Sequence, residues 1–270
     1  MISIAAWNVN SIRTRLPQCL AWLRRDRPDV VLLQETKVMD DGFPRLEFED
    51  LGYNLALSGE KSYNGVAIFS KYPLEDVRRG LPGDDSDMQA RYIEAVLSIP
   101  ATKEQQARGG GVIRVASVYV PNGQTTDSDK YAYKLRFLTR LAAHARTLLA
   151  YDEPLVIGGD FNIAPADLDV HDPAAWEGSV LTHLEARAKL RTLLYSGLHD
   201  AYRILHPAGR QFSWWDYRGN GWARDDGLRI DHLLLSPQAA DRLEACGMVR
   251  DMRGEEKASD HVPVLCQLAV

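Results

Sequence analysis

The sequence predicts one α/β domain with mixed β-sheets. Short strand-like runs alternate along the chain with amphipathic stretches at helical spacing, which is the pattern of an α/β protein. No repeat, low-complexity linker or break in composition divides the 270 residues. A chain of this length can also bury one large core. We therefore expect residues 1–270 to form a single domain.

Strands are predicted where short runs are apolar or alternate between apolar and polar residues. These runs cover residues 2–9, 30–33, 65–70, 92–99, 112–120, 154–158, 228–235 and 262–270. The polar stretch 101–111 ends in three glycines and is expected to be a mobile hairpin loop.

Three stretches are predicted to be helices. Residues 16–27 carry leucines at helical spacing, with Thr14 as the expected N-cap and Pro17 in the first turn. The longest candidate covers residues 129–150, and a shorter one covers 184–194. Their aromatic and leucine side chains are better interpreted as core than as a ligand site.

The composition is that of an ordinary soluble protein, with 45% hydrophobic and 26% charged residues. The net charge of −5 argues mildly against nucleic-acid binding, but clustered metal-binding carboxylates would lower it without touching a binding face. No apolar run approaches 18 residues, and no signal peptide is visible at the N-terminus. The three scattered cysteines suggest reduced thiols, so we expect a cytoplasmic protein without a membrane span.

Acidic and amide residues occur at the ends of several apolar strands. A carboxylate there is costly to bury unless it is paired or bound to a metal. Strand ends are also where ligand sites collect in α/β sheets. Oxygen donors with few nitrogens and no nearby cysteine motif favour Mg²⁺ or Mn²⁺ over zinc. The residues in this position are Asn8, Glu35, Asp160, Asn162, Asp231 and the pair Asp260-His261.

Asp160 and Asn162 lie two residues apart, directly after the run 154–158. Gly158 and Gly159 are expected to let the chain turn sharply before them. A carboxylate beside a carboxamide can position an attacking water and contact a phosphate. Alone, the tetrapeptide is equally consistent with an ordinary turn closed by side-chain hydrogen bonds.

Three further groups of residues have a chemical interpretation, and two of them also have a structural one. His261 follows Asp260, and a histidine held by an acid can donate to a phosphate or move a proton; the alternative is a capping aspartate beside an ordinary histidine. Tyr119 ends a predicted strand, from which its hydroxyl could reach a phosphate. The aromatic stretch 212–218 could grip a sugar or base, or could be a half-exposed strand and loop.

Taken together, these motifs resemble those of the exonuclease III family of apurinic/apyrimidinic endonucleases, within the endonuclease/exonuclease/phosphatase superfamily. The resemblance runs nearly end to end. It rests on residues 7–13, 33–37, 65–71, 119–123, 159–165, 212–218, 228–231 and 259–263. It implies a four-layer α/β sandwich in which two mixed β-sheets pack face to face and are flanked by helices.

The resemblance implies a metal site and a catalytic network. Glu35 is implied to be the main ligand of Mg²⁺ or Mn²⁺, with Asn8 beside it. Asp160 would position or deprotonate the attacking water, Asn162 would orient that water and contact the phosphate, and Asp231 would support this group. A second metal position would be formed by Asp160, Asn162, Asp260 and His261.

The resemblance also implies how the substrate is held. His261, oriented by Asp260, would contact the phosphate, and Tyr119 matches the active-site tyrosine of the family. Arg91 and Asn122 correspond to regions near the DNA backbone. The family selects a flipped-out abasic sugar in a small apolar pocket. The wall of that pocket would be Trp214, Leu228 and Ile230.

The implied reaction is metal-dependent nicking of double-stranded DNA 5′ to abasic sites, with 3′-to-5′ exonuclease and 3′-phosphatase or phosphodiesterase activity at the same centre. A monomer is the default. Two departures leave the balance of these activities open: the individual stretch 169–183, and Asn122 where some relatives carry glutamine. Two alternatives remain: the same fold acting on RNA or a phospholipid, and a DNA-binding module without catalysis.

Overall fold

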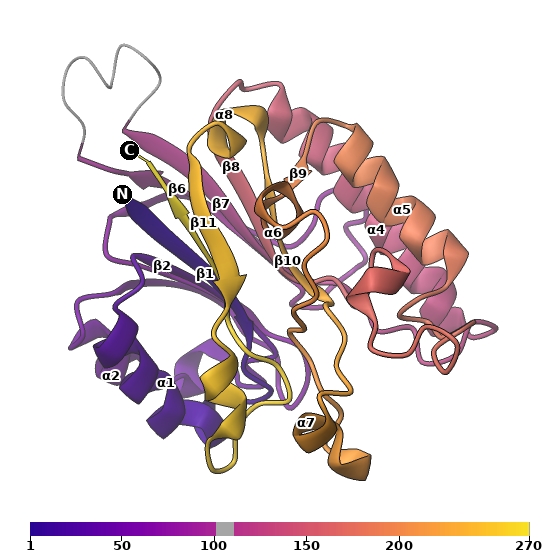
Figure 1. Ribbon diagram of the computed structural model, residues 1–270. Coiled ribbons are helices and arrows are strands. Elements are labelled where there is room, and N and C mark those ends of the chain that lie inside the picture. Colours follow the sequence, from indigo (N-terminus) through magenta and orange to yellow (C-terminus); the bar gives the residue numbers. More distant parts are fainter. Residues whose placement is uncertain (101–110, 270) are drawn as a thin grey trace.

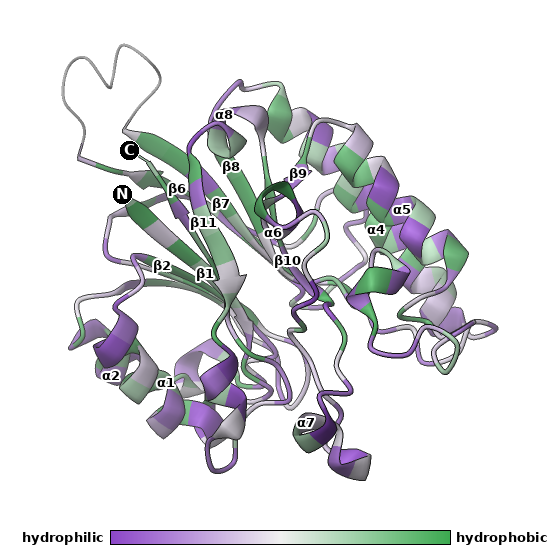
Figure 2. Ribbon diagram, in the orientation of Figure 1, coloured by the Kyte–Doolittle hydropathy of each residue, from purple (hydrophilic) through white to green (hydrophobic). Residues whose placement is uncertain are grey.

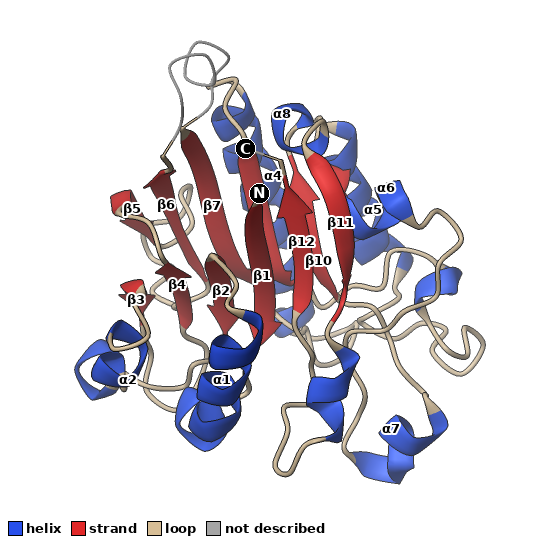
Figure 3. Cartoon of the chain, turned by 60° about the vertical axis from the view of Figure 1, so that its left-hand side comes forward, coloured by secondary structure: helices blue, strands red, loops and turns tan. Residues whose placement is uncertain are grey.

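The computed structural model describes residues 1–100 and 111–269. It confirms the predicted fold class, because two mixed β-sheets pack face to face with helices on both outer sides (Figure 1; Figure 3). Within the described residues each sheet has six strands. The hairpin loop predicted over 101–111 lies outside the described residues, apart from its last glycine.

The first sheet has the strand order β11-β12-β1-β2-β4-β3. Its strands are β1 (Ile2–Asn8), β2 (Val30–Gln34), β3 (Asn54–Ser58), β4 (Val66–Ser70), β11 (Leu243–Met248) and β12 (Val264–Leu268). Because β1 and β2 run parallel, with Asn8 opposite Gln34, their carboxyl ends meet at one edge. This brings Asn8 close to Glu35, the residue after β2.

The second sheet has the order β5-β6-β7-β8-β10-β9. Its strands are β5 (Leu74–Arg79), β6 (Tyr92–Ser98), β7 (Val112–Tyr119), β8 (Leu155–Asp160), β9 (His199–Asp200) and β10 (Asp231–Leu235). Strands β7 and β8 are parallel, and their last residues, Tyr119 and Asp160, are paired with each other. Strand β10 runs antiparallel to β8 and starts where β8 ends, which places Asp231 opposite Asp160.

Helices cover the outer face of each sheet (Figure 1). Helix α1 (Ile12–Asp26) and α2 (Arg45–Glu49) lie on the first sheet, and α4 (Asp129–Leu149) and α5 (Leu184–Tyr195) lie on the second. Shorter helices are α6 (Ala201–Leu205), α7 (Gly221–Arg224) and α8 (Pro237–Ala240). Of the helices in the described ranges, none combines the length and apolar character needed to cross a bilayer.

Three hydrophobic cores separate the four layers. The central core lies between the sheets and includes Ile4, Leu32, Val115 and Leu233. The other two cores lie between each sheet and its own helices. Figure 2 shows the apolar strands of the sandwich in green, whereas the outer helices alternate between apolar and polar residues. This stack holds the strand ends rigidly in place, so side chains at one edge have fixed positions.

Helix α1 starts earlier than the sequence predicted. It begins at Ile12, and the N-cap is Ser11, whose hydroxyl accepts from the Thr14 backbone N–H at 3.4 Å. The prediction of Thr14 as the cap was therefore wrong, and Pro17 lies inside the helix rather than in its first turn. The start is fixed by tertiary contacts, since the backbone N–H of Ser11 donates to the Glu35 carbonyl at 2.8 Å.

The two glycines before Asp160 do not make the predicted turn, because both belong to strand β8. A Cβ on Gly158 would lie 2.6 Å from a methyl group of Leu233 in the core between the sheets. A Cβ on Gly159, where φ is +151°, would lie 2.0 Å from the Val118 carbonyl oxygen. These positions therefore need glycine because neighbouring atoms approach closely, and the turn follows Asp160.

Candidate active site

The structure gathers most of the predicted site residues at one edge of the two sheets. The amide of Asn8, at the end of β1, donates to Glu35 Oε1 at 2.8 Å and to Asp160 Oδ2 at 2.9 Å. It therefore links the first sheet to the second. The side chains that meet at this edge are Asn8, Glu35, Tyr119, Asp160, Asn162, Asp231 and His261.

Glu35 lies in a strained turn after β2. Its φ of +52° is unusual for glutamate, and such strain is often found at functional sites. Its Oε2 lies 2.7 Å from Lys37 Nζ. Burial works against the charged form, but Lys37 and the Asn8 amide lower the pKa of Glu35 below its ordinary value. Glu35 is therefore ionised and, with a side chain that is 17% exposed, still reachable from solvent.

Asp160 and Asn162 form a tight turn at the end of β8. The backbone N–H of Asn162 donates to Asp160 Oδ1 at 2.8 Å, and its amide donates to Asp160 Oδ2 at 3.2 Å and to the Val120 carbonyl at 3.0 Å. Burial, together with the charges of Asp231 and Glu35, raises the pKa of Asp160 to about 7, against the opposing effect of His261 and Asn8. A carboxylate with that pKa can accept a proton near neutral pH.

His261 is held by Asp231. Its Nδ1 lies 2.9 Å from Asp231 Oδ2, and its Nε2 lies 3.8 Å from Asp160 Oδ2. Ser213 donates to Asp231 Oδ2 at 2.6 Å and so fixes that carboxylate. Burial would lower the pKa of His261, but Asp231 and Asp160 raise it to about 10. The ring is therefore an imidazolium that can donate from both nitrogens.

The prediction that Asp260 orients His261 was wrong. Asp260 accepts hydrogen bonds from Trp214 Nε1 and from the Asn10 amide, both at 3.0 Å. Neighbouring residues of an extended segment point to opposite sides, so Asp260 and His261 face different partners. Among the described residues, possible metal-ligand atoms of Asp160, Asp231 and His261 all lie within 4.8 Å of one another. Asp260 does not belong to this group.

The donor set fits a hard divalent cation. Within the described residues, the carboxylates of Glu35, Asp160 and Asp231 form ion pairs with Lys37 and His261, so carboxylates outnumber their paired cations. Carboxylate and amide oxygens are the donors that such cations prefer. Lys37 was not among the predicted site residues, although it stands in the same sequence motif as Glu35. Its ammonium already places a positive charge against the carboxylate that the resemblance assigns to the metal.

Tyr119 and Asn122 extend the site along the end of β7. Burial and the charges of Glu35 and Asp160 raise the pKa of Tyr119 well above its ordinary value, so its phenol remains a donor. The Arg91 guanidinium lies 4.7 Å above the Tyr119 ring. The Asn122 amide donates to Asn162 Oδ1 at 3.0 Å. Arg91, Tyr119 and Asn122 line one hollow of about 460 Å³ beside the carboxylates.

The residues predicted to form the pocket wall pack against a tryptophan that the sequence did not identify. Leu228 and Ile230 are 0% and 2% exposed, and Trp214 is half-buried and paired with Leu228 through the backbone. The ring of Trp176 packs edge-on against Trp214, with centroids 5.9 Å apart. Trp176 belongs to the stretch 169–183 that the sequence left unassigned, and an isolated tryptophan there was the only signal.

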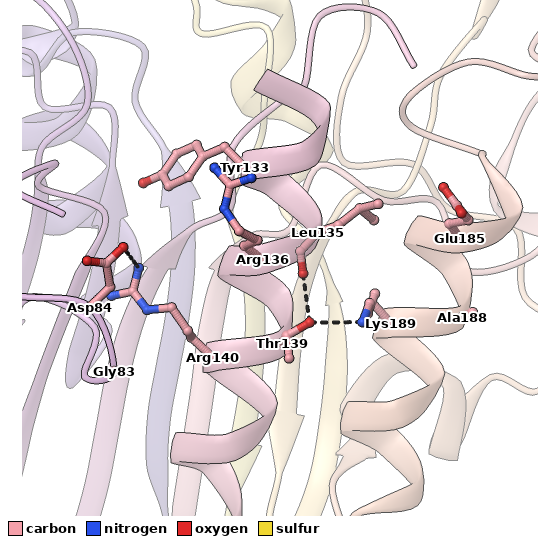
Figure 4. A pocket seen from close by; sticks show the side chains of 10 residues that line it. All are labelled: Gly83, Asp84, Tyr133, Leu135, Arg136, Thr139, Arg140, Glu185, Ala188 and Lys189. Atoms are coloured by element: carbon pink, nitrogen blue, oxygen red, sulfur yellow. Dashed lines mark hydrogen bonds and ion pairs between the residues drawn. The ribbon is translucent and has the colours of Figure 1, made fainter. Parts of the chain in front are cut away.

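A separate hollow of about 660 Å³ lies between α4, α5 and the loop at Gly83 (Figure 4). Arg140 pairs there with Asp84, and Thr139 lies between Lys189 and the Leu135 carbonyl. None of the predicted site residues lines this hollow. It is therefore distinct from the cluster at the strand ends.

Comparison with known proteins agrees with this geometry. Residues 5–261 match the Endonuclease/Exonuclease/phosphatase family, and the chain belongs to that family. The chain is 36% identical to exodeoxyribonuclease III of Haemophilus influenzae over 267 residues, which cover 96% of this chain and 97% of that protein. These findings make the chain a nuclease-type hydrolase, and metal dependence is typical of the family.

Two solved structures are similar over their full lengths. The structure of an AP endonuclease from Archaeoglobus fulgidus matches with a TM-score of 0.92 and 37% identity. The 3′-5′ exonuclease NExo from Neisseria meningitidis matches with a TM-score of 0.93 and 39% identity. In both comparisons the match covers 100% of each chain.

Proposed function

We propose that this protein is a DNA repair phosphodiesterase that nicks double-stranded DNA 5′ to abasic sites. The observation that carries the proposal is the place of a buried carboxyl, Asp160. Its Oδ2 lies 3.8 Å from His261 Nε2 and 2.9 Å from the Asn8 amide, which also binds Glu35. Relatives named as an AP endonuclease and an exodeoxyribonuclease III support the substrate class. Another solved relative is a 3′ phosphatase bound to product DNA hairpin.

In this proposal Asp160 accepts a proton from the attacking water. The new bond forms between the water oxygen and phosphorus, and the bond to the 3′ oxygen breaks in line. Asn162 keeps the Asp160 carboxylate in place through two hydrogen bonds. His261 and Tyr119 donate to the phosphate oxygens, where charge develops. The leaving 3′ oxygen takes up a proton from solvent, so the products are a 3′-hydroxyl and a 5′-deoxyribose phosphate.

Glu35 and Asn8 would hold Mg²⁺, or Mn²⁺ in its place. When bound, the cation supplies charge neutralisation at the phosphate and at the leaving oxygen. The hard oxygen donors and the excess of carboxylates at the strand ends support this assignment. Asp231 serves the site indirectly, because it orients His261 and keeps it protonated.

Trp214, Leu228 and Ile230 would form the wall that selects an abasic sugar. A missing base removes most of the stacking cost of extrusion, and a small apolar pocket excludes an intact nucleoside. Arg91 and Asn122 would contact the DNA backbone beside the site. The same centre would also remove 3′ nucleotides and 3′ phosphates, since each reaction cleaves a phosphate ester at a 3′ oxygen. We expect the enzyme to act as a monomer.

The test is cleavage of a duplex with one synthetic abasic site, in Mg²⁺ or in EDTA. A second duplex with a recessed 3′ end and a third with a 3′ phosphate measure the accompanying activities. We expect Mg²⁺-dependent nicking 5′ to the lesion. Binding without nicking would indicate a non-catalytic DNA-binding protein. Neither binding nor nicking would indicate another substrate for the same fold, which competition with RNA would then identify.

A further inference from the structure

Lys134 is a fully buried lysine on α4, with 0% of its surface exposed. Lysine is almost never buried to this degree unless it is paired. Its ammonium donates to three backbone carbonyls: those of Asn162 and Val180 at 2.7 Å and that of Asn122 at 3.1 Å. These bonds use all three of its donors. Burial lowers the pKa of Lys134 to about 7, so the ammonium is held there at an energetic cost.

The three carbonyls belong to three separate segments of the active site. Asn122 lies in the turn after β7, and Asn162 lies in the turn after β8. Val180 lies in the stretch 169–183, which also carries Trp176 beside the proposed pocket. In the described part of the chain, no other hydrogen bond reaches these three oxygens. Lys134 is therefore the common anchor of the three segments.

The anchor is closely connected to the proposed base. Asn162 has a φ of +51°, a left-handed conformation that must be held by its surroundings. Its backbone N–H and its amide both donate to Asp160. The path from the Lys134 ammonium to the Asp160 carboxylate therefore passes through one residue. An apolar side chain in place of Lys134 would fill the space but leave three buried carbonyls without a donor.

We propose that Lys134 is a positioning residue of the active site, which locks these three segments together so that Asn162 holds Asp160 in its reactive orientation. It contacts neither the reacting atoms nor a metal. The inference rests on the proposed function, because it assigns Lys134 a role in the same reaction.

The first test compares Lys134→Met with Arg146→Met, an exposed position on the same helix. A misplaced catalytic group costs on the order of 100-fold in rate. We expect Lys134→Met to lower kcat on abasic duplex by about that factor and to raise KM by a smaller factor, since two of the three anchored segments border the substrate. Arg146→Met should leave both unchanged. A Lys134→Met enzyme that is less heat-stable but has unchanged kcat would overturn the proposal.

A rescue experiment separates positioning from packing. Lys134→Ala leaves a cavity beside the three carbonyls, which a small primary ammonium ion can enter. We expect ethylammonium to restore part of kcat, whereas tetramethylammonium, which has the charge but no N–H group, should not. Equal effects of the two ions would contradict the hydrogen-bonding role.

A third measurement needs no substrate. Amide hydrogen exchange should become faster around residues 120–124, 162–166 and 178–183 in Lys134→Met, and remain unchanged in Arg146→Met. Unchanged hydrogen exchange in all three segments of Lys134→Met overturns the inference. This outcome is independent of whether the enzyme nicks abasic DNA. If Lys134→Met does not fold, Lys134→Arg keeps the charge with a different donor geometry. The same loss of kcat and faster exchange are expected there, and their absence overturns the inference.

Discussion

Two buried charged clusters lie side by side at β10 and behave in opposite ways. The catalytic cluster contains Glu35, Asp160, Asp231, His261 and Lys37. The structural cluster contains Asp169, Asp200, Arg203 and Arg229. In the structural cluster two carboxylates face two guanidiniums, at 2.5 to 2.7 Å. Among the ion pairs of the described residues, the three carboxylates of the catalytic cluster have two cationic partners, Lys37 and His261.

The difference is visible in matching residues of the two clusters. Burial opposes the charge of Asp200, but Arg229 lowers its pKa, whereas burial raises the pKa of Asp160 to about 7. Burial and Arg229 lower the pKa of His232, whereas Asp231 and Asp160 raise that of His261 to about 10. A balanced buried cluster fixes the structure, and one with excess negative charge is suited to proton transfer and cation binding.

The largest expected effect is the loss of activity in Asp160→Asn. Removing a general base costs typically 10²–10⁴-fold, so we expect kcat to fall within about that range at saturating Mg²⁺. Stability should stay the same or rise, because one of three crowded carboxylates is removed. Nicking rates and urea unfolding of the same preparation measure both. Near wild-type activity would exclude Asp160 as the base.

For the structural cluster we expect the opposite result, a loss of stability. Arg229→Met leaves Asp200 buried without a guanidinium partner and Asp169 with only that of Arg203. Breaking a buried pair in this way costs about 3–5 kcal/mol. Urea unfolding measures the loss. Unchanged stability together with abolished activity would mean that the two clusters are not separate in function.

A smaller effect concerns pH. The folded-state pKa of His261 is raised above 6.5, so its stabilisation is present below pH 6.5 and is lost as pH rises towards 10. The pKa of His232 is lowered, so its stabilisation is present above pH 6.5 and is lost as pH falls. Thermal unfolding of His261→Gln and His232→Gln in EDTA should therefore deviate from wild type in opposite pH ranges. Parallel pH profiles would contradict this assignment.

The sequence predicted the buried strands well, because short apolar runs between polar segments have few alternatives. It missed β3, β5 and β11, which lie at sheet edges and whose sequences NLALS, LEDVRR and LEACGM lack a continuous apolar pattern. The two-residue strand β9 is too short to leave a signal.

Site residues were predictable where a motif carried them, but their partners were not. Asp260 was chosen because it is adjacent to His261 in sequence, whereas the structure brings Asp231 from 30 residues away. Lys134 was not recognised because a lysine among apolar helix residues normally extends to solvent. Both depend on tertiary contacts that local patterns do not encode.

Calorimetric titration of the protein with Mn²⁺, without DNA, tests most directly whether the carboxylates at the strand ends hold a cation. We expect binding to wild type, loss of that binding in Glu35→Gln, and retention in Glu47→Gln, an exposed position on α2. Equal binding by all three proteins would show that the excess charge at the strand ends does not hold the cation.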